Sequence, residues 1–214
     1  MMRSSIPFQK QEVEDYEQRR YRGLDQRIVH QRERKILEKI LEGIKEESPR
    51  VLDIPSGYGR FSALFLERGW KLVSSDLSFH MVRRARERTP IEGSHSAVVS
   101  DATAGLPFKR GVFTLLVSMR FFHHLHQREE RVFVLKEFRA ITSRWIIISY
   151  YRRNAFHSLQ RKLRRALKKS RTKICMISRD NFEREVSQAG LEVVGVFPLF
   201  RIFHSQSIAL LKKG

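Results

Sequence analysis

Cysteine is almost absent from this sequence: Cys175 is the single one among 214 residues. One cysteine excludes an intramolecular disulfide framework and a Cys-rich zinc site, so we expect no metal centre and a reducing compartment, the cytoplasm first. The sequence also lacks any uninterrupted apolar run of about 18 residues, the length that a helix needs to cross a bilayer. Met1–Lys10 lacks the apolar core of a secretory signal. We therefore expect any membrane contact to be peripheral.

Acidic residues are scarce relative to basic ones. The chain holds 23 Asp plus Glu against 42 Lys plus Arg, which gives a formal net charge of +19. A bias of this size favours a polyanionic neighbour, either nucleic acid or an anionic membrane. Hydrophobic residues make up 41% of the chain, enough for a core, so the length favours one domain with a heavily solvated surface.

The N-terminal zone, residues 1–49, is polar and helical in pattern. From Glu12 to Lys45 the apolar residues recur at helical spacings, which predicts an amphipathic helix that ends at Glu46–Pro49. The apolar stripe consists of Ile28, Ile36, Leu37, Ile40, Leu41 and Ile44. We interpret Phe8–Gly23 as an N-terminal lid.

Residues 50–214 alternate short apolar runs with helical stretches, which predicts parallel strands joined by crossover helices. The expected strands are Val51–Ile54, Leu72–Ser75, Ala97–Val99, Phe113–Val117 and Trp145–Ile148, followed by a closing antiparallel pair at Leu191–Leu199 and Ser205–Lys212. The expected helices are Phe61–Arg68, Ser78–Arg88, Glu129–Ile141 and Ser178–Ala189. The predicted fold class is α/β, a Rossmann-like, doubly wound, mostly parallel sheet of seven strands with a C-terminal antiparallel hairpin.

A glycine-containing loop follows the first expected strand, in the segment Asp53 to Gly59. Gly57 and Gly59 allow a ligand to approach the backbone, and the next helix presents free N–H groups. Asp76 ends the second strand, where a carboxylate can accept both hydroxyls of a ribose. The third glycine of the dinucleotide fingerprint is missing, which favours an adenosyl group without pyrophosphate.

These motifs, in this order over residues 50–150, resemble class I methyltransferases that use S-adenosylmethionine (SAM). The resembling segments are Asp53–Gly59, Asp76-Leu77-Ser78, Asp101-Ala102 before Leu106-Pro107-Phe108, and the closing hairpin. The resemblance implies that Asp53 and the Gly57/Gly59 backbone face the methionyl end of SAM, Asp76 the ribose, and Asp101 and Ala102 the adenine. It also implies cofactor contacts for Pro55, Leu77 and Met119.

The sequence departs from the family pattern at three places. Pro55 stands where glycine is usual, Thr114 where aspartate is usual, and Ser143-Arg144 where a Gly-Gly turn is common. Proline fixes φ and removes a donor, which can alter cofactor affinity. A non-catalytic SAM-binding protein is therefore one alternative to an enzyme.

The candidate catalytic residues are His123, His124 and Tyr150. Methyl transfer is an in-line attack on an activated sulfonium, so the enzyme positions the acceptor and removes a proton where the nucleophile is a hydroxyl. The family often carries a histidine just beyond the fourth strand, where His123 and His124 stand. A His pair at such a junction is also commonly structural, and Tyr150 or Tyr151 could serve packing as well as the substrate pocket.

Residues 152–175 form a strongly basic insert, with a Lys/Arg cluster opposite Phe156, Leu159, Leu163 and Leu167. This pattern predicts a basic amphipathic helix at 156–173, which fits peripheral contact with an anionic membrane. RNA binding and a soluble lid are the alternatives. We expect Cys175 to lie in this insert, away from the strand ends.

The leading functional hypothesis is a SAM-dependent methyltransferase for a small or lipid-like acceptor at an anionic membrane surface. An RNA methyltransferase is the alternative. The sequence shows neither an Asn/Asp-Pro-Pro-Tyr element nor a catalytic cysteine motif, which disfavours RNA.

Overall fold

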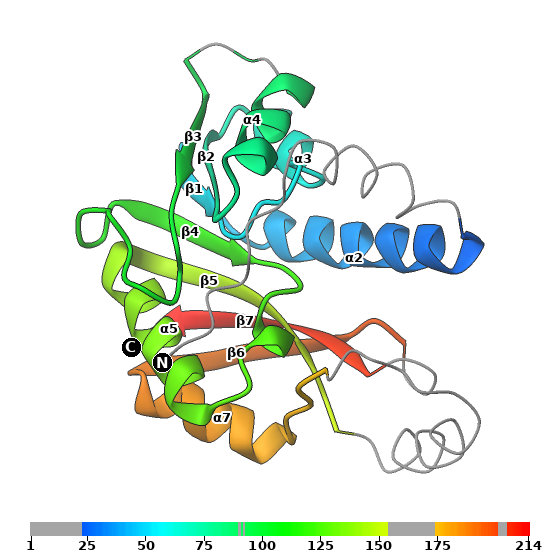
Figure 1. Cartoon of the computed structure of the whole chain (residues 1–214), viewed down its shortest axis with the longest axis vertical. Coiled ribbons are helices and arrows are strands. Elements are labelled where there is room, and N and C mark those ends of the chain that lie inside the picture. Colours follow the sequence, from blue (N-terminus) through cyan, green and yellow to red (C-terminus); the bar gives the residue numbers. More distant parts are fainter. Residues whose placement is uncertain (1–22, 90, 92, 154–173, 201–204) are drawn as a thin grey trace.

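The computed structural model describes residues 23–89, 91, 93–153, 174–200 and 205–214 (Figure 1). Its centre is one seven-stranded sheet in the order β3-β2-β1-β4-β5-β7-β6. The strands are β1 (Arg50–Asp53), β2 (Lys71–Asp76), β3 (His95–Val99), β4 (Phe113–Ser118), β5 (Thr142–Tyr151), β6 (Leu191–Pro198) and β7 (Gln206–Lys213).

The first five strands run parallel, and β7 runs antiparallel to both β5 and β6. The Rossmann-like α/β class with a closing antiparallel pair is thereby confirmed. Strand β3 begins at His95, two residues before the expected start. The His95 ring hydrogen-bonds the Ser74 hydroxyl of β2 at 2.8 Å, which ties the first residue of β3 to the neighbouring strand.

The helices are α2 (Leu24–Glu42), α3 (Ser62–Leu66), α4 (Phe79–Arg88), α5 (Arg128–Ile141) and α7 (Arg179–Gln188), with a 3₁₀ turn η1 at Phe122–His124. Side chains mark three of the starts: Ser78 and Ser178 accept from backbone N–H groups of α4 and α7, and Gln127 and Glu130 form a capping box on α5. Helix α2 ends at Glu42, earlier than expected, because Gly43 closes it with an N–H bond to Ile40 O.

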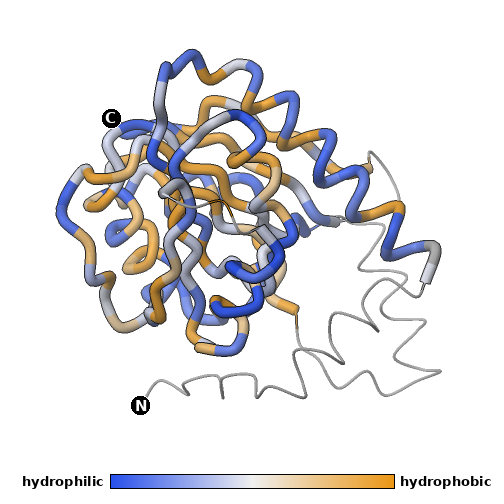
Figure 2. Tube along the Cα trace, turned by 90° about the horizontal axis from the view of Figure 1, so that it is seen from above, coloured by the Kyte–Doolittle hydropathy of each residue, from blue (hydrophilic) through white to orange (hydrophobic). Residues whose placement is uncertain are grey.

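Helices cover both faces of the sheet, and each face has its own apolar layer. Val51 and Ile147 point toward α2 and α3, whereas Leu52 and Ile146 point toward α5 and α7. Alternate residues of the same strand therefore serve opposite layers, which explains why the central strands read as continuous apolar runs. Figure 2 shows this concentration of hydrophobic residues in the interior and the alternating character of the helices.

Two predicted features lie outside the described residues. The lid at Phe8–Gly23 falls almost wholly there, as does the amphipathic part of the basic insert, 156–173. Both remain predictions, and so does the division of the chain at residue 49. Within the described ranges, none of the helices combines the length and apolar character that crossing a bilayer requires.

Candidate functional site

The loop after β1 begins at a deeply buried carboxyl group. Asp53 is the last residue of β1 and is 2% exposed. Burial raises the pKa of Asp53 to about 7, an effect that Arg60 opposes and Asp76 reinforces. No hydrogen bond from another described residue reaches this carboxyl group in the structure. The carboxyl group therefore lies at the end of β1 without a donor among the described residues, and a ligand that brings a donor would satisfy it.

The two glycines of the loop have different structural roles. Gly57 has φ of 54° and Gly59 has φ of 77°, in the region that disfavours side chains. A Cβ on Gly57 would meet nothing within 4 Å, so the space beside this residue is open. A Cβ on Gly59 would lie 2.9 Å from the Cα of Ala85, so this glycine lets α4 approach the loop. Pro55, joined to Ile54 by a cis peptide, lies half-buried at the start of the loop.

Asp76, at the end of β2, braces this loop. Its carboxylate accepts from the Gly57 N–H at 3.0 Å and from the Ser78 N–H at 3.0 Å. Burial raises the pKa of Asp76, while backbone hydrogen bonds from Ser78, Gly57 and Leu77 act in the opposite direction. Each carboxylate oxygen has a second lone pair, so the bracing is compatible with accepting ribose hydroxyls.

The loop after β3 holds the residues expected to face adenine. Asp101 accepts from both the backbone N–H and the hydroxyl of Thr103, at 2.8 and 2.7 Å. Ala102 is buried and Leu77, on the neighbouring loop, is half-buried. The Ser100 N–H donates to Asp76 O at 3.1 Å, which ties this third loop to the end of β2. Three predicted cofactor segments therefore meet at one edge of the sheet.

The loop after β4 brings the candidate catalytic histidines to the same edge. Met119 is buried in the layer beneath α2, and His123 and His124 lie in η1 with ring centroids 4.0 Å apart. His123 is half-buried and meets the ring of Tyr151 edge-on at 5.0 Å, whereas His124 is exposed. The two histidines therefore offer one sheltered and one accessible ring.

Tyr150 lies in a different environment from Tyr151. Its side chain is fully buried and stacks on Phe182 of α7, with centroids 4.0 Å apart and planes 5° apart. Its hydroxyl has no hydrogen-bond partner among the described residues. The catalytic role of Tyr150 remains a prediction, and this packing favours the structural alternative.

Cys175 requires a correction. We expected it away from the strand ends, but its N–H donates to His123 O at 3.0 Å, and its sulfur lies 3.6 Å from Nη1 of Arg131. The end of the insert therefore returns to the loop after β4, because Ile177 pairs with the end of β5. Sequence spacing alone gives no measure of where an insert closes.

Sequence reasoning missed three charged residues at this edge. Glu33 of α2 is fully buried and binds both Arg60, next to Gly59, and Arg120, next to Met119. A signal was present: Glu33 stands four residues before Leu37, on the apolar stripe of the expected helix. A carboxylate on a buried stripe indicates a paired charge.

The residues at this edge fit an adenosyl cofactor that carries an amino-acid group. The open space at Gly57 admits the ligand, the Asp53 carboxyl suits an ammonium donor, and Asp76 suits a diol. Among the described residues no group of three or more His, Cys, Asp or Glu side chains is arranged to hold a metal ion.

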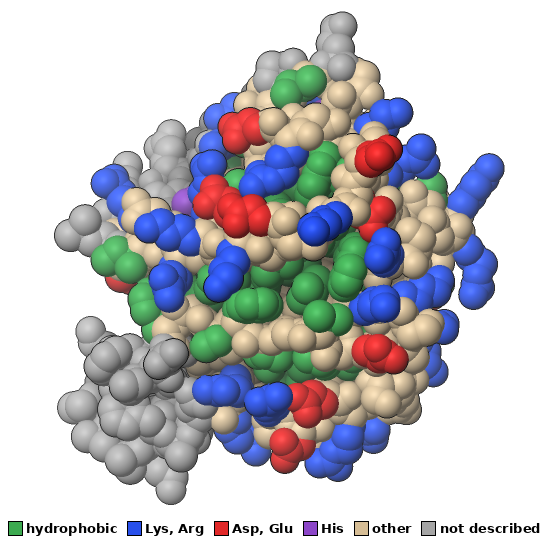
Figure 3. Space-filling view, turned by 180° about the vertical axis from the view of Figure 1, so that it is seen from behind, with side chains coloured by type: hydrophobic (Ala, Val, Ile, Leu, Met, Phe, Trp, Pro, Cys, Tyr) green, Lys and Arg blue, Asp and Glu red, His purple; other side chains and the backbone are tan. Residues whose placement is uncertain are grey.

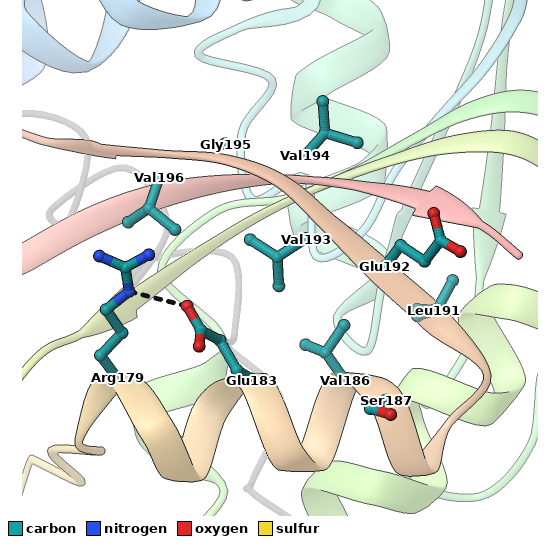
Figure 4. A pocket seen from close by; sticks show the side chains of 10 residues that line it. All are labelled: Arg179, Glu183, Val186, Ser187, Leu191, Glu192, Val193, Val194, Gly195 and Val196. Atoms are coloured by element: carbon teal, nitrogen blue, oxygen red, sulfur yellow. Dashed lines mark hydrogen bonds and ion pairs between the residues drawn. The ribbon is translucent and has the colours of Figure 1, made fainter.

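A separate groove of about 460 Å³ lies between α7 and the edge strand β6. Figure 4 shows its valine side chains, with Arg179 and Glu183 paired at one end. None of its lining residues belongs to the cofactor loops, and β6 lies at the far edge of the sheet from β2 and β3. We therefore separate this groove from the candidate site.

Comparison with known proteins decides the family. A family model described as a methyltransferase domain matches residues 28–196, most of the chain. The chain belongs to this methyltransferase family. A search among curated proteins found no match.

Solved methyltransferases share the fold of the chain at low identity. Magnesium protoporphyrin IX methyltransferase from Synechocystis PCC 6803 with bound SAH is 15% identical, has a TM-score of 0.77, and is matched over 94% of both chains. The same enzyme with bound SAM is 16% identical with a TM-score of 0.70, over 99% of this chain and 100% of that one. A SAM-dependent methyltransferase from Methanosarcina mazei is 16% identical with a TM-score of 0.68, over 81% and 96%.

The prediction of a SAM-dependent methyltransferase is thus confirmed, both for the type of enzyme and for its cofactor. The roles given to individual residues of the methyltransferase site remain predictions. These are Asp53, Pro55, Gly57, Gly59, Asp76, Leu77, Asp101, Ala102 and Met119 for the cofactor, and His123, His124 and Tyr150 for catalysis.

Proposed function

We propose that this methyltransferase modifies a small or lipid-like acceptor that it meets at an anionic membrane surface. The observation that carries the proposal is the attachment of the basic insert to the His123 loop. Ile177 donates to Tyr151 O at 2.8 Å, and Cys175 donates to His123 O at 3.0 Å. The insert therefore leaves and re-enters the domain beside the candidate acceptor site.

The chain's own residues have defined tasks in this reaction. When SAM is bound it supplies a methyl group on a positively charged sulfur. Asp53 and Asp76 hold and orient the bound group, and the loop after β4 meets the acceptor. Where the acceptor is a hydroxyl, a histidine nitrogen of this loop would take its proton while the hydroxyl oxygen receives the methyl group that bound SAM would supply, leaving the donor sulfur as a neutral thioether.

Charge supports an anionic surface as the place of reaction. Figure 3 shows Lys and Arg side chains spread over one face of the protein, with some Asp and Glu among them and apolar side chains near its centre. The insert, residues 152–175, is different, because neither it nor the flanking sequence from Phe138 to Arg179 contains an acidic residue. Each well-placed cation near an anionic leaflet contributes about 1 kcal/mol, so the insert is the natural contact.

The test uses the full chain with vesicles. Sedimentation with phosphatidylcholine vesicles is compared with vesicles that also contain phosphatidylglycerol, and labelled SAM is then added to follow methyl transfer to a lipid extract. We expect binding to the anionic vesicles only. We also expect its loss when Arg164, Arg165, Lys168 and Lys169 are changed to Gln. Indifference to lipid charge would remove the membrane part of the proposal.

The alternatives make different predictions in the same experiment. An RNA methyltransferase would label RNA and retain it at moderate salt, with the same four substitutions abolishing retention. A non-catalytic SAM-binding protein would bind labelled SAM and transfer no methyl group to lipid, RNA or cell extract.

A further inference from the structure

Both carboxylate oxygens of Glu33 accept hydrogen bonds, close to the loops that follow β1 and β4. Its Oε1 accepts from Arg120 Nε at 2.7 Å and from Gln206 Nε2 at 2.6 Å. Its Oε2 accepts from Arg60 Nη1 at 2.8 Å and from Arg120 Nη2 at 2.8 Å. Four donors from three other segments thus converge on one fully buried carboxylate of α2.

Two of the three donor residues, Arg60 and Arg120, lie at the loops after β1 and β4, and the third begins a strand. Arg60 follows Gly59 directly, Arg120 opens the loop that carries the histidines, and Gln206 is the first residue of β7. Helix α2 is therefore fastened, through one side chain, to the loops after β1 and β4.

The contacts with Glu33 also help to hold the backbone conformation of Arg120. Its φ is 57°, the one positive value among non-glycine residues of the described ranges. Such a conformation persists only where surrounding contacts hold it. Here the Arg120 guanidinium forms a bidentate salt bridge with Glu33, and the Arg120 backbone N–H donates to Ser149 Oγ at 2.6 Å.

Arg60 adds an electrostatic consequence. It interacts with two buried carboxyl groups: it pairs with Glu33 and also lies close enough to Asp53 to stabilise its charged form. While Glu33 holds Arg60, the Asp53 carboxyl stays available to a ligand. Without the charge of Glu33, Arg60 gains by turning to Asp53 and would occupy it.

We infer that Glu33 is a positioning residue that couples the docking of α2 to cofactor binding, by holding Arg120 in its loop conformation and keeping Arg60 off Asp53. The inference rests on the SAM-dependent activity of the family and not on the identity of the acceptor, so failure of the membrane proposal leaves it intact.

The test is Glu33→Gln, which keeps the shape and removes the charge. We expect the dissociation constant for SAM, measured by calorimetry, to rise at least tenfold. We also expect a changed pH profile, because an Arg60 turned toward Asp53 keeps that carboxyl ionised to lower pH. We expect SAM binding by the wild type to depend on pH near neutrality, where Asp53 titrates, and we expect the variant to lose this dependence.

The matched control is Glu185→Gln. Glu185 is buried and forms a bidentate salt bridge with Arg131, at 2.6 and 2.8 Å. This salt bridge lies between α5 and α7, on the other face of the sheet. It makes the same kind of ion pair, and the hydrogen bonds of Arg131 and Glu185 reach none of the predicted cofactor residues; of the loop after β4, Arg131 contacts only the far end, at Leu125 and His126. We expect this variant to lose stability while its SAM dissociation constant stays within twofold of wild type.

A second variant covers the case in which Glu33→Gln does not fold. Arg120→Lys keeps the positive charge but cannot form the bidentate salt bridge with Glu33. We expect this variant to have a higher dissociation constant for SAM than wild type. A folded Glu33→Gln protein that binds SAM like wild type, with an unchanged pH profile, would overturn the inference. So would a Glu185→Gln protein that weakens SAM binding equally.

Discussion

At the scale of single residues, the buried carboxyl group of Asp53 has the largest pKa shift among the candidate cofactor residues. In the folded protein its pKa is about 7 against an ordinary 3.8. The folded state therefore binds more protons than the unfolded state between these values, so the contribution of Asp53 to stability falls as pH rises through this window. Asp53→Asn should thus be more stable than wild type at pH 8, with a smaller difference at pH 5, as measured by thermal unfolding without SAM.

The same substitution should weaken SAM binding. A charge-assisted hydrogen bond contributes roughly 1.5–3 kcal/mol, which corresponds to a loss of roughly 10- to 100-fold in affinity. Opposite effects on stability and on binding are the signature of a residue that serves the ligand. An Asp53→Asn protein that loses both stability and SAM binding would show that Asp53 is a structural residue, and one with unchanged SAM binding would show that this carboxyl group does not hold the cofactor.

The two loop glycines allow a second residue-scale prediction. Gly57→Ala should cost about 1–2 kcal/mol of unfolding free energy for its left-handed backbone. Gly59→Ala should cost more, by roughly 1–3 kcal/mol, because its Cβ would lie 2.9 Å from the Ala85 backbone. Urea unfolding of both proteins measures the difference, and equal losses would mean that α4 moves aside without cost.

The sequence predicted the positions of the candidate cofactor residues better than it predicted the residues that support them. Asp53, Gly57 and Asp76 follow strands in a recognisable order, so their place at the sheet edge could be predicted. Glu33 could not be assigned a partner, because Arg60 and Arg120 lie 27 and 87 positions away in the chain. Long-range pairing of charges depends on the packing of α2, which the helical pattern does not determine.

At the scale of elements, a buried ion pair joins α5 and α7 in addition to their apolar packing. Arg131 binds Glu185 and also donates to Leu125 O at 3.1 Å and His126 O at 3.2 Å. Glu185→Gln leaves the guanidinium without its counterion in the interior, which costs roughly 3–5 kcal/mol. Urea unfolding should show this loss.

The matching double variant tests the reason for that loss. In Arg131→Met with Glu185→Leu neither charge remains buried, so we expect most of the stability to return. If the double variant is as unstable as Glu185→Gln, the hydrogen bonds of Arg131 to the η1 loop, and not the ion pair, hold the two helices together.

Element types were more predictable than element ends. The five parallel strands and the closing pair were confirmed, since runs such as Trp145–Ile148 are buried on both faces. The observed β5 is longer, Thr142–Tyr151, because Thr142 pairs with Phe113 of β4 and the last three residues, Ser149–Tyr151, still pair with β7. Polar and aromatic residues such as Ser149 and Tyr151 do not carry the apolar signal that predicts a strand.

At the scale of the whole molecule, the carboxyl ends of the parallel strands place the loops of β1, β2, β3 and β4 on one edge. Asp76 contacts two of these loops: its carboxylate accepts from the Gly57 N–H, and its backbone carbonyl accepts from the Ser100 N–H. A ligand that bridges the loops should therefore stabilise the fold as a unit, and it should do so only while this bracing carboxylate is present.

SAM should consequently raise the unfolding temperature of the entire domain. At a free concentration 100 times the dissociation constant, binding adds about 2.7 kcal/mol. For a chain of 214 residues this corresponds to roughly 5–10 °C. Asp76→Ala should abolish the shift because it removes both the ribose acceptor and the brace of the Gly57 loop. Arg34→Ala, which breaks an exposed pair with Glu38 on the outside of α2, is the control and should keep the shift. A full shift in Asp76→Ala would place the cofactor elsewhere on the molecule.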